Sequence, residues 1–188
     1  MKKSKFYFMF SILAIQCCVT PKGVFHKDFD IDKLTTIFVE EFKPYNGYPS
    51  SGEMIRDLII QHLLRRKFVV KDLNTEDVKY ILSGSVTKFY PEKRYLVYIG
   101  EEGKDNIIVG STLTEISGSY VYKISSAFGL KNAEIVATNS VVGVSAKLIE
   151  KDTGKILWSS SFTYEALTVE TAADVVVNYL VTSLTGKK

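Results

Sequence analysis

The C-terminal half of the chain alternates apolar and polar positions, which is the spacing of a half-buried β-strand. The alternation covers residues 142–148 and returns over residues 156–162, on either side of the turn sequence Asp152-Thr153-Gly154. This order predicts a β-hairpin, with Trp158 in its second strand.

Two other segments place apolar side chains three and four residues apart, as on one face of a helix. In the first segment this face holds Ile55, Leu58, Ile59 and either His62 or Leu63. Ser50 stands three residues before Glu53, a capping-box spacing that predicts where the helix begins. The basic run 65–67 closes the helix, and a solvated helix end explains this run better than an anion site does. Residues 168–184 predict a final helix.

Shorter runs of β-branched and aromatic residues predict three further strands, at residues 35–40, 68–70 and 80–89. Gly84 interrupts the third strand and indicates a bulge or a close approach of another part of the chain. The order strand, helix, strand, meander, helix predicts an α/β (α+β) fold, a mixed β-sheet with helices packed on it.

Within the segment 95–138, residues 107–130 are β-like and rich in Ser, Thr, Gly and Tyr. Their alternating segments of about ten residues fit a membrane-spanning β-hairpin. They fit a long hairpin that extends a soluble sheet equally well. We favour the soluble form, so that residues 95–138 become an extended β-hairpin insertion in a domain covering residues 34–188.

The N-terminus has the pattern of a secretion signal. Three lysines precede an apolar run of about ten residues, where a permanent membrane helix needs roughly 20. We expect residues 1–16 to be a signal peptide and residues 17–33 to be a tether. Cys17 and Cys18 follow the apolar run directly, and this segment resembles the signals of bacterial lipoproteins. The resemblance implies acylation, palmitate included, of Cys17, with Cys18 as the fallback; an ordinary secretory signal is the alternative.

The formal charge of +3 belongs to the signal, because Lys2, Lys3 and Lys5 leave the mature protein near 3 − 3 = 0. A neutral domain lacks the basic surface of a nucleic-acid binder, so we expect no nucleic-acid partner. The membrane is expected to hold the protein through the lipid anchor. Both cysteines lie at the signal boundary, which excludes a disulfide framework in the mature domain.

The sequence offers no constellation of residues for catalysis. His62 lies on an apolar helix face, which is typical of a packed residue rather than a ligand, and no spacing indicates zinc. The loop at 100–105 lacks the Ser or Thr that a phosphate loop needs after its lysine. Glu40 and Glu41 are adjacent, so on a strand they point to opposite faces and cannot act together as a catalytic carboxylate pair. We therefore expect no catalytic residue, no cofactor, no metal site and no enzymatic activity.

Four segments together resemble the core of the CsgG/LpoB/TolB-N-terminal group of bacterial envelope proteins. They are residues 36–42, 66–70, 78–87 and 146–159, the last containing Asp152-Thr153-Gly154 and Trp158. The resemblance implies a lipoprotein anchored to the outer membrane and facing mainly the periplasm.

Three functions then stand open. The leading hypothesis is a lipid-anchored, non-enzymatic cell-envelope lipoprotein that acts as a protein-binding or assembly module with an envelope protein partner. The first alternative is a subunit of an oligomeric CsgG-like secretion pore that inserts residues 95–138. The second alternative is an auxiliary lipoprotein of an envelope transporter. A homo-oligomer is compatible with the first two.

Overall fold

The structure is a computed structural model that describes most of the chain from Lys22 onward. The described residues are 22–27, 29–34, 36–99, 105–108, 121–126 and 133–186. The predicted signal peptide, Cys17 and Cys18 lie outside these residues.

In the described part of the chain, six strands form the main sheet in the order β1-β10-β9-β4-β2-β3. Their bounds are β1 Val24–Phe25, β2 Thr36–Val39, β3 Val69–Lys71, β4 Tyr80–Tyr90, β9 Ser140–Glu150 and β10 Ile156–Ala166. β2 pairs in parallel with β3 and β4, whereas the other neighbours are antiparallel. The sheet is therefore mixed, as predicted.

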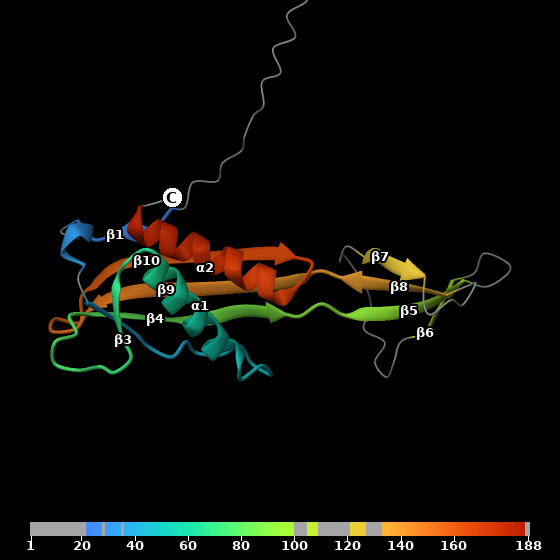
Figure 1. The fold of residues 1–188 in the computed structure, drawn as a ribbon, viewed down its shortest axis with the longest axis horizontal. Helices are drawn as coiled ribbons and strands as arrows, with labels where there is room; N and C mark the ends of the chain where they lie inside the picture. The colour runs from blue at the N-terminus through green and yellow to red at the C-terminus, as the bar shows by residue number, and fades with distance from the viewer. Residues whose placement is uncertain are drawn as a thin grey trace, which may run out of the picture.

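Helices α1 (Ser51–Arg65) and α2 (Val169–Thr185) pack on one face of the main sheet, called here the helix face (Figure 1). The other face is called the open face. Strand residues that alternate toward the helices are buried, as Val144 and Leu148 of β9 illustrate. Trp158 is only 1% exposed and belongs to the same core. These observations confirm the α+β fold with helices packed on a mixed sheet.

The beginning of α1 differs from the predicted capping box. Ser50 is the N-cap residue, but its side chain makes no capping hydrogen bond. The Ser51 hydroxyl holds the preceding loop: it accepts from the N–H of Tyr45 at 2.9 Å and donates to the carbonyl of Tyr48 at 2.7 Å. The predicted start of the helix is confirmed, but the capping hydrogen bond is absent, because the preceding loop folds back onto the helix, which a local spacing rule does not include.

Strand β4 runs without interruption through Gly84. A Cβ atom at Gly84 would lie 2.2 Å from the carbonyl oxygen of Ser145 and 2.5 Å from the ring of Phe42. The close approach predicted at this glycine is confirmed, and its cause is the fully buried ring of Phe42. The bulge in β4 falls later, between Val86 and Lys88.

A second sheet lies beyond the end of β4 and β9 and makes the molecule elongated (Figure 1). Its order is β6-β5-β8-β7, with β5 Arg94–Ile99, β6 Asp105–Ile108, β7 Val121–Ser126 and β8 Ala133–Thr138. Two hydrogen bonds between residues 93 and 138 join its base: the N–H of Thr138 donates to the carbonyl of Lys93, and the N–H of Lys93 donates to the Thr138 hydroxyl, both at 2.9 Å. The predicted insertion thus contains two strands, β5 and β8, that lead out of and back into the main sheet.

Part of the segment predicted as a tether contacts the domain. Val24 and Phe25 pair with Ser159 and Trp158 of β10, which makes β1 an edge strand of the main sheet. Residues Ile31–Lys33 form a short 3-10 helix, η1, before β2 begins. No helix in the described residues is long and apolar enough to cross a bilayer.

Candidate functional site on the open face of the main sheet

The open face carries a row of small hydroxyl side chains at the middle of the sheet. Ser83 of β4 pairs with Lys147 of β9, and Ser85 pairs with Ser145. On the other side of β9, Lys147 pairs with Ser159 of β10. Cross-strand partners point to the same face, so these five side chains share the open face.

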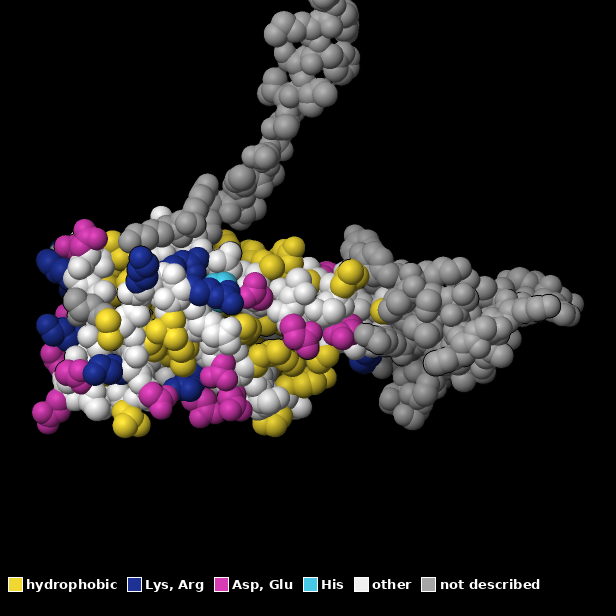
Figure 2. Space-filling view, in the orientation of Figure 1, with side chains coloured by type: hydrophobic (Ala, Val, Ile, Leu, Met, Phe, Trp, Pro, Cys, Tyr) yellow, Lys and Arg dark blue, Asp and Glu magenta, His cyan; other side chains and the backbone are white. Residues whose placement is uncertain are grey.

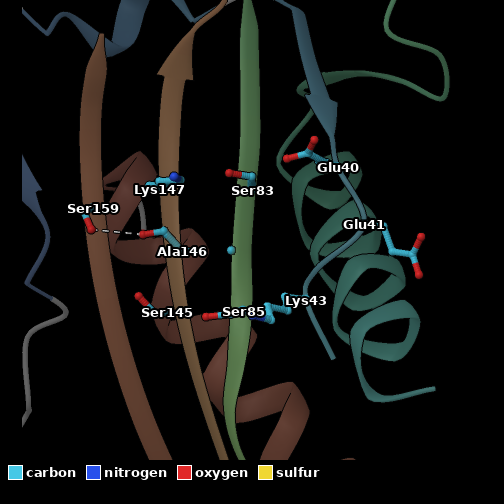
Figure 3. Close-up of a pocket in the computed structure, with 10 residues that line it drawn as sticks. Glu40, Glu41, Lys43, Ser83, Ser85, Ser145, Ala146, Lys147 and Ser159 are labelled. Atoms are coloured by element: carbon cyan, nitrogen blue, oxygen red, sulfur yellow. Dashed lines mark hydrogen bonds between the residues drawn. The ribbon is translucent and has the colours of Figure 1, made fainter. Parts of the chain in front are cut away.

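These residues line a groove of about 470 Å³ (Figure 3). Its lining residues are Glu40, Glu41, Lys43, Ser83, Gly84, Ser85, Ser145, Ala146, Lys147 and Ser159. Figure 3 shows α1 and α2 behind the strands and the labelled serines in front of them. The groove therefore opens on the side of the sheet that neither helix covers.

Residues 40–43 form one wall of the groove by continuing alongside β4 after β2 ends. The N–H of Glu40 donates to the carbonyl of Leu82 at 2.9 Å, and the N–H of Lys43 donates to the carbonyl of Gly84 at 3.0 Å. Figure 3 shows the carboxylate of Glu40 directed toward Ser83 and that of Glu41 directed away from the strands. Their divergence agrees with the prediction that adjacent residues point to opposite sides.

The charged groups of the groove are available to a ligand. Among the described residues, none of Glu40, Lys43 and Lys147 forms an ion pair. The Ser159 hydroxyl donates to the carbonyl of Ala146 at 3.3 Å, and within the described residues no groove serine is hydrogen-bonded to a basic side chain. The groove thus offers hydroxyl groups and charges of both signs to a ligand.

Sequence reasoning did not single out this groove. Ser83, Ser85 and Ser145 occupy the polar positions of alternating strands, which is also the pattern of an ordinary solvated face. The only signal was the small size of these residues, which leaves the surface hollow once the strands pair. The carboxylates of residues 40 and 41 come from a parallel neighbour distant in the sequence, and only the sheet order places them there.

His62 lies on the helix face, between α1 and α2, and takes no part in the groove. Its Nε2 atom is 2.8 Å from Oδ1 of Asp174, and Arg66 lies 3.4 Å from its Nδ1 atom. A guanidinium group only donates, so Nδ1 is the acceptor and Nε2 carries the proton. With 6% exposure and both ring nitrogens occupied, His62 is the packed residue that the sequence predicted.

Arg66 extends the same network toward the end of α2. It donates to Asn178 at 2.9 Å and to Thr182 at 2.8 Å. Burial lowers the pKa of the Arg66 guanidinium below its ordinary value. Basic side chains gather on this part of the helix face (Figure 2), but Arg66 is occupied by α2, so its role is to hold the two helices together.

An aromatic patch lies on the loop before α1 and at the end of β4. The rings of Tyr45 and Tyr90 meet edge to face at 5.6 Å, and their hydroxyls are 2.8 Å apart. Tyr48 packs against Phe89 at 5.3 Å. The hydrogen bond between the Tyr45 and Tyr90 hydroxyls raises the pKa of Tyr45. Tyr48 and Tyr90 are 38% and 50% exposed, so this patch is a second surface open to contact.

No protein-family model matches the chain, and no curated protein matches it in sequence. Its fold is nevertheless shared with solved bacterial proteins. The PelC dodecamer from Paraburkholderia phytofirmans matches with a TM-score of 0.53 and 15% identity, over 87% of this chain and 96% of that one. A variant of that dodecamer in another crystal form also gives 0.53 and 15%, over 89% and 97%.

A weaker similarity extends to Lipoprotein GNA1162 from Neisseria meningitidis, with a TM-score of 0.42 and 12% identity. It covers 81% of this chain and 96% of that one. At these identities the comparisons establish the fold alone.

Proposed function

We propose that this protein is a non-enzymatic lipoprotein of the bacterial cell envelope that binds a protein partner through the groove on its open face. The anchor in this proposal is an acyl group on Cys17, or on Cys18, in the outer membrane, with the domain facing the periplasm. The observation that carries the binding role is the groove itself: small serines on the sheet, flanked by charges of both signs that form no ion pair with a described residue.

The chemistry of the groove suits a protein surface. Small side chains allow a helix or strand of the partner to approach closely, and the half-buried hydroxyls of Ser85, Ser145 and Ser159 can each donate or accept a hydrogen bond. Lys147 and Glu40 would pair with complementary charges at the rim, where they add specificity and speed of association.

A second copy of this chain is the partner we favour. The solved structures with this fold at a TM-score of 0.53 are dodecamers. The open face and the helix face are different surfaces, so a contact between the open face of one copy and another surface of the next is heterologous. Heterologous contacts repeat and close into a ring when the rotation allows it.

The test extracts the acylated full-length protein from bacterial membranes in mild detergent and measures the mass of its complexes. Ser145→Arg places a long cation in the groove, and Gln61→Arg places the same side chain on the exposed surface of α1 as the matched control. We expect wild type and Gln61→Arg to form a complex larger than one copy and Ser145→Arg to lose it. A wild-type protein that is a single copy without any co-extracted partner contradicts the proposal, as does a complex that Ser145→Arg leaves intact.

The anchor is tested separately by mass spectrometry of the mature N-terminus. An acylated Cys17 or Cys18 agrees with the proposal. A free start beyond Cys18 contradicts the anchor while leaving the binding groove open to test.

A pore subunit is the second candidate, because β5 and β8 carry the chain from β4 and back to β9 through a projecting sheet. In that case residues 95–138 would enter the membrane in an oligomer. Protease added to intact membranes separates the two functions: protection of this segment favours the pore, and cleavage within it favours the binding module.

A further inference from the structure

The first described residues are fixed to the domain by hydrogen bonds as well as by strand pairing. The N–H of Lys22 donates to the Tyr179 hydroxyl at 3.0 Å, and the Ser160 hydroxyl donates to the carbonyl of Lys22 at 3.2 Å. The N–H of His26 donates to the carbonyl of Leu157 at 2.8 Å. Lys22 is therefore part of the folded domain, at the edge of the main sheet.

This attachment leaves little chain between the anchor and the domain. The following step rests on the proposed function, in which Cys17 is acylated. Four residues lie between Cys17 and Lys22, and the five steps from Cα to Cα span about 17 Å when fully extended. The polar layer of a bilayer is itself about 6 Å deep. A free tether over residues 17–33 would reach about three times as far. The short link holds the β1 edge of the sheet beside the lipid surface.

Two apolar side chains are exposed at this edge. Val24 is 77% exposed and Phe25 is 44% exposed. The Phe25 ring stacks on Phe29, with centroids 5.4 Å apart, and Phe29 packs against the core. Phe25 is thereby held at the surface instead of being free to fold inward. Val24 pairs with Ser159 and Phe25 with Trp158, so the two side chains lie on opposite sides of the edge strand. When the strand lies edge-on to a bilayer, both enter the boundary between headgroups and acyl chains.

Lys22 and Lys27 flank these two residues and are both exposed. Neither forms an ion pair with a described residue. Lysines beside apolar side chains bind the phosphates of anionic lipids while the apolar groups insert. The same corner of the molecule also holds the C-terminal end of α2 (Figure 1).

We propose that edge strand β1 docks on an anionic lipid surface, with Val24 and Phe25 in the headgroup layer and Lys22 and Lys27 against lipid phosphates. The domain then has a fixed orientation: β1 faces the membrane, and the opposite edge strand, β3, faces away from it. Five strand spacings separate these edges, or roughly 24 Å.

The test measures the depth of a nitroxide label on the acylated full-length protein, reconstituted in vesicles of phosphatidylethanolamine and phosphatidylglycerol. Val24→Cys carries the label, in a chain with Cys18→Ser so that no second thiol reacts. Leu73→Cys is the matched control, because Leu73 is 69% exposed and follows β3 at the other edge. Emission from Trp158 verifies that each variant is folded.

We expect the label at position 24 to collide several-fold more often with oxygen than with a water-soluble nickel complex, and the label at position 73 to show the reverse. Phe25→Ser should return the label at position 24 to water. If the protein floats with the vesicles but both labels are in water, docking is wrong while the anchor stands. If the protein does not float at all, whether Cys18 is kept or replaced, the proposed anchor fails, and docking fails with it.

Discussion

The contact between Gly23 and Trp158 allows a sharp test of how the N-terminal strand is held. A Cβ atom at Gly23 would lie 2.1 Å from Nε1 of Trp158 and 2.8 Å from Cδ1. The indole is 1% exposed and packed in the core, so it has no room to move aside. We expect Gly23→Val to lift β1 from β10.

The cost has two parts. Three hydrogen bonds, made by Lys22, Ser160 and His26, are lost at about 1 kcal/mol each. Exposing about half of a tryptophan side chain, roughly 100 Å², adds about 2.5 kcal/mol. The conformational freedom that the released residues regain offsets part of this sum. We expect a net loss of about 2–3 kcal/mol, which lowers the melting temperature by about 7 °C.

The assay uses the fluorescence of Trp158, which is the single tryptophan of the chain. Gly23→Val should shift its emission to longer wavelength, increase quenching by acrylamide and lower the unfolding midpoint. Val24→Leu is the control, because this neighbouring side chain is 77% exposed and its enlargement should change nothing. Unchanged emission and an unchanged midpoint in Gly23→Val would refute the reasoning.

Three further predictions concern a helix end and two titrating groups. Lys67 follows α1 with a φ of 64°, in the left-handed region, and the N–H of Phe68 donates to the Leu63 carbonyl at 3.2 Å. Lys67→Gly should therefore relieve backbone strain and raise the free energy of unfolding by roughly 0.5–1 kcal/mol in a denaturant titration. A loss of stability in this variant would contradict the prediction. The folded protein holds the Tyr45 proton more tightly than the unfolded chain does, because the pKa is raised above 10.0. The Tyr45–Tyr90 pair therefore stabilises fully below that pH and loses its effect as the pH rises through the folded pKa. Tyr90→Phe should remove this alkaline loss in melts taken above pH 9, and a wild-type slope retained in the variant would exclude the pair as its cause. The pKa of Asp77 is lowered from 3.8, first by the Thr75 hydroxyl and then by Lys71, so its contribution is present above pH 3.8 and lost as the pH falls through the folded pKa. Melts between pH 5 and pH 2 should show this acid loss in wild type and not in Asp77→Asn, and equal slopes in the two proteins would argue against it.

The elements with strong periodicity could be read from the sequence. The hairpin of β9 and β10 and helix α2 follow from alternation and from helical spacing, and each places its apolar side on the core. Burial requires that spacing, so the pattern and the fold agree. Gly84 also gave a correct signal, because only a missing Cβ leaves room for the ring of Phe42.

Contacts between segments distant in the sequence were beyond such reasoning. The loop before α1 folds back and bonds to Ser51. Residues 22–27 looked like a polar tether because their partners lie more than 130 positions later. The anchor at Cys17 or Cys18 stays a prediction, since both lie outside the described residues.

The sequence by itself determined the class of fold, the hairpin, the two helices and the packed state of His62, because each depends on local spacing against a single core. The tertiary structure decided the groove on the open face and the docking of β1 over Trp158. The physical reason is the order of the strands: it brings Glu40 to Ser83 and Val24 to Ser159, and no local pattern contains that order.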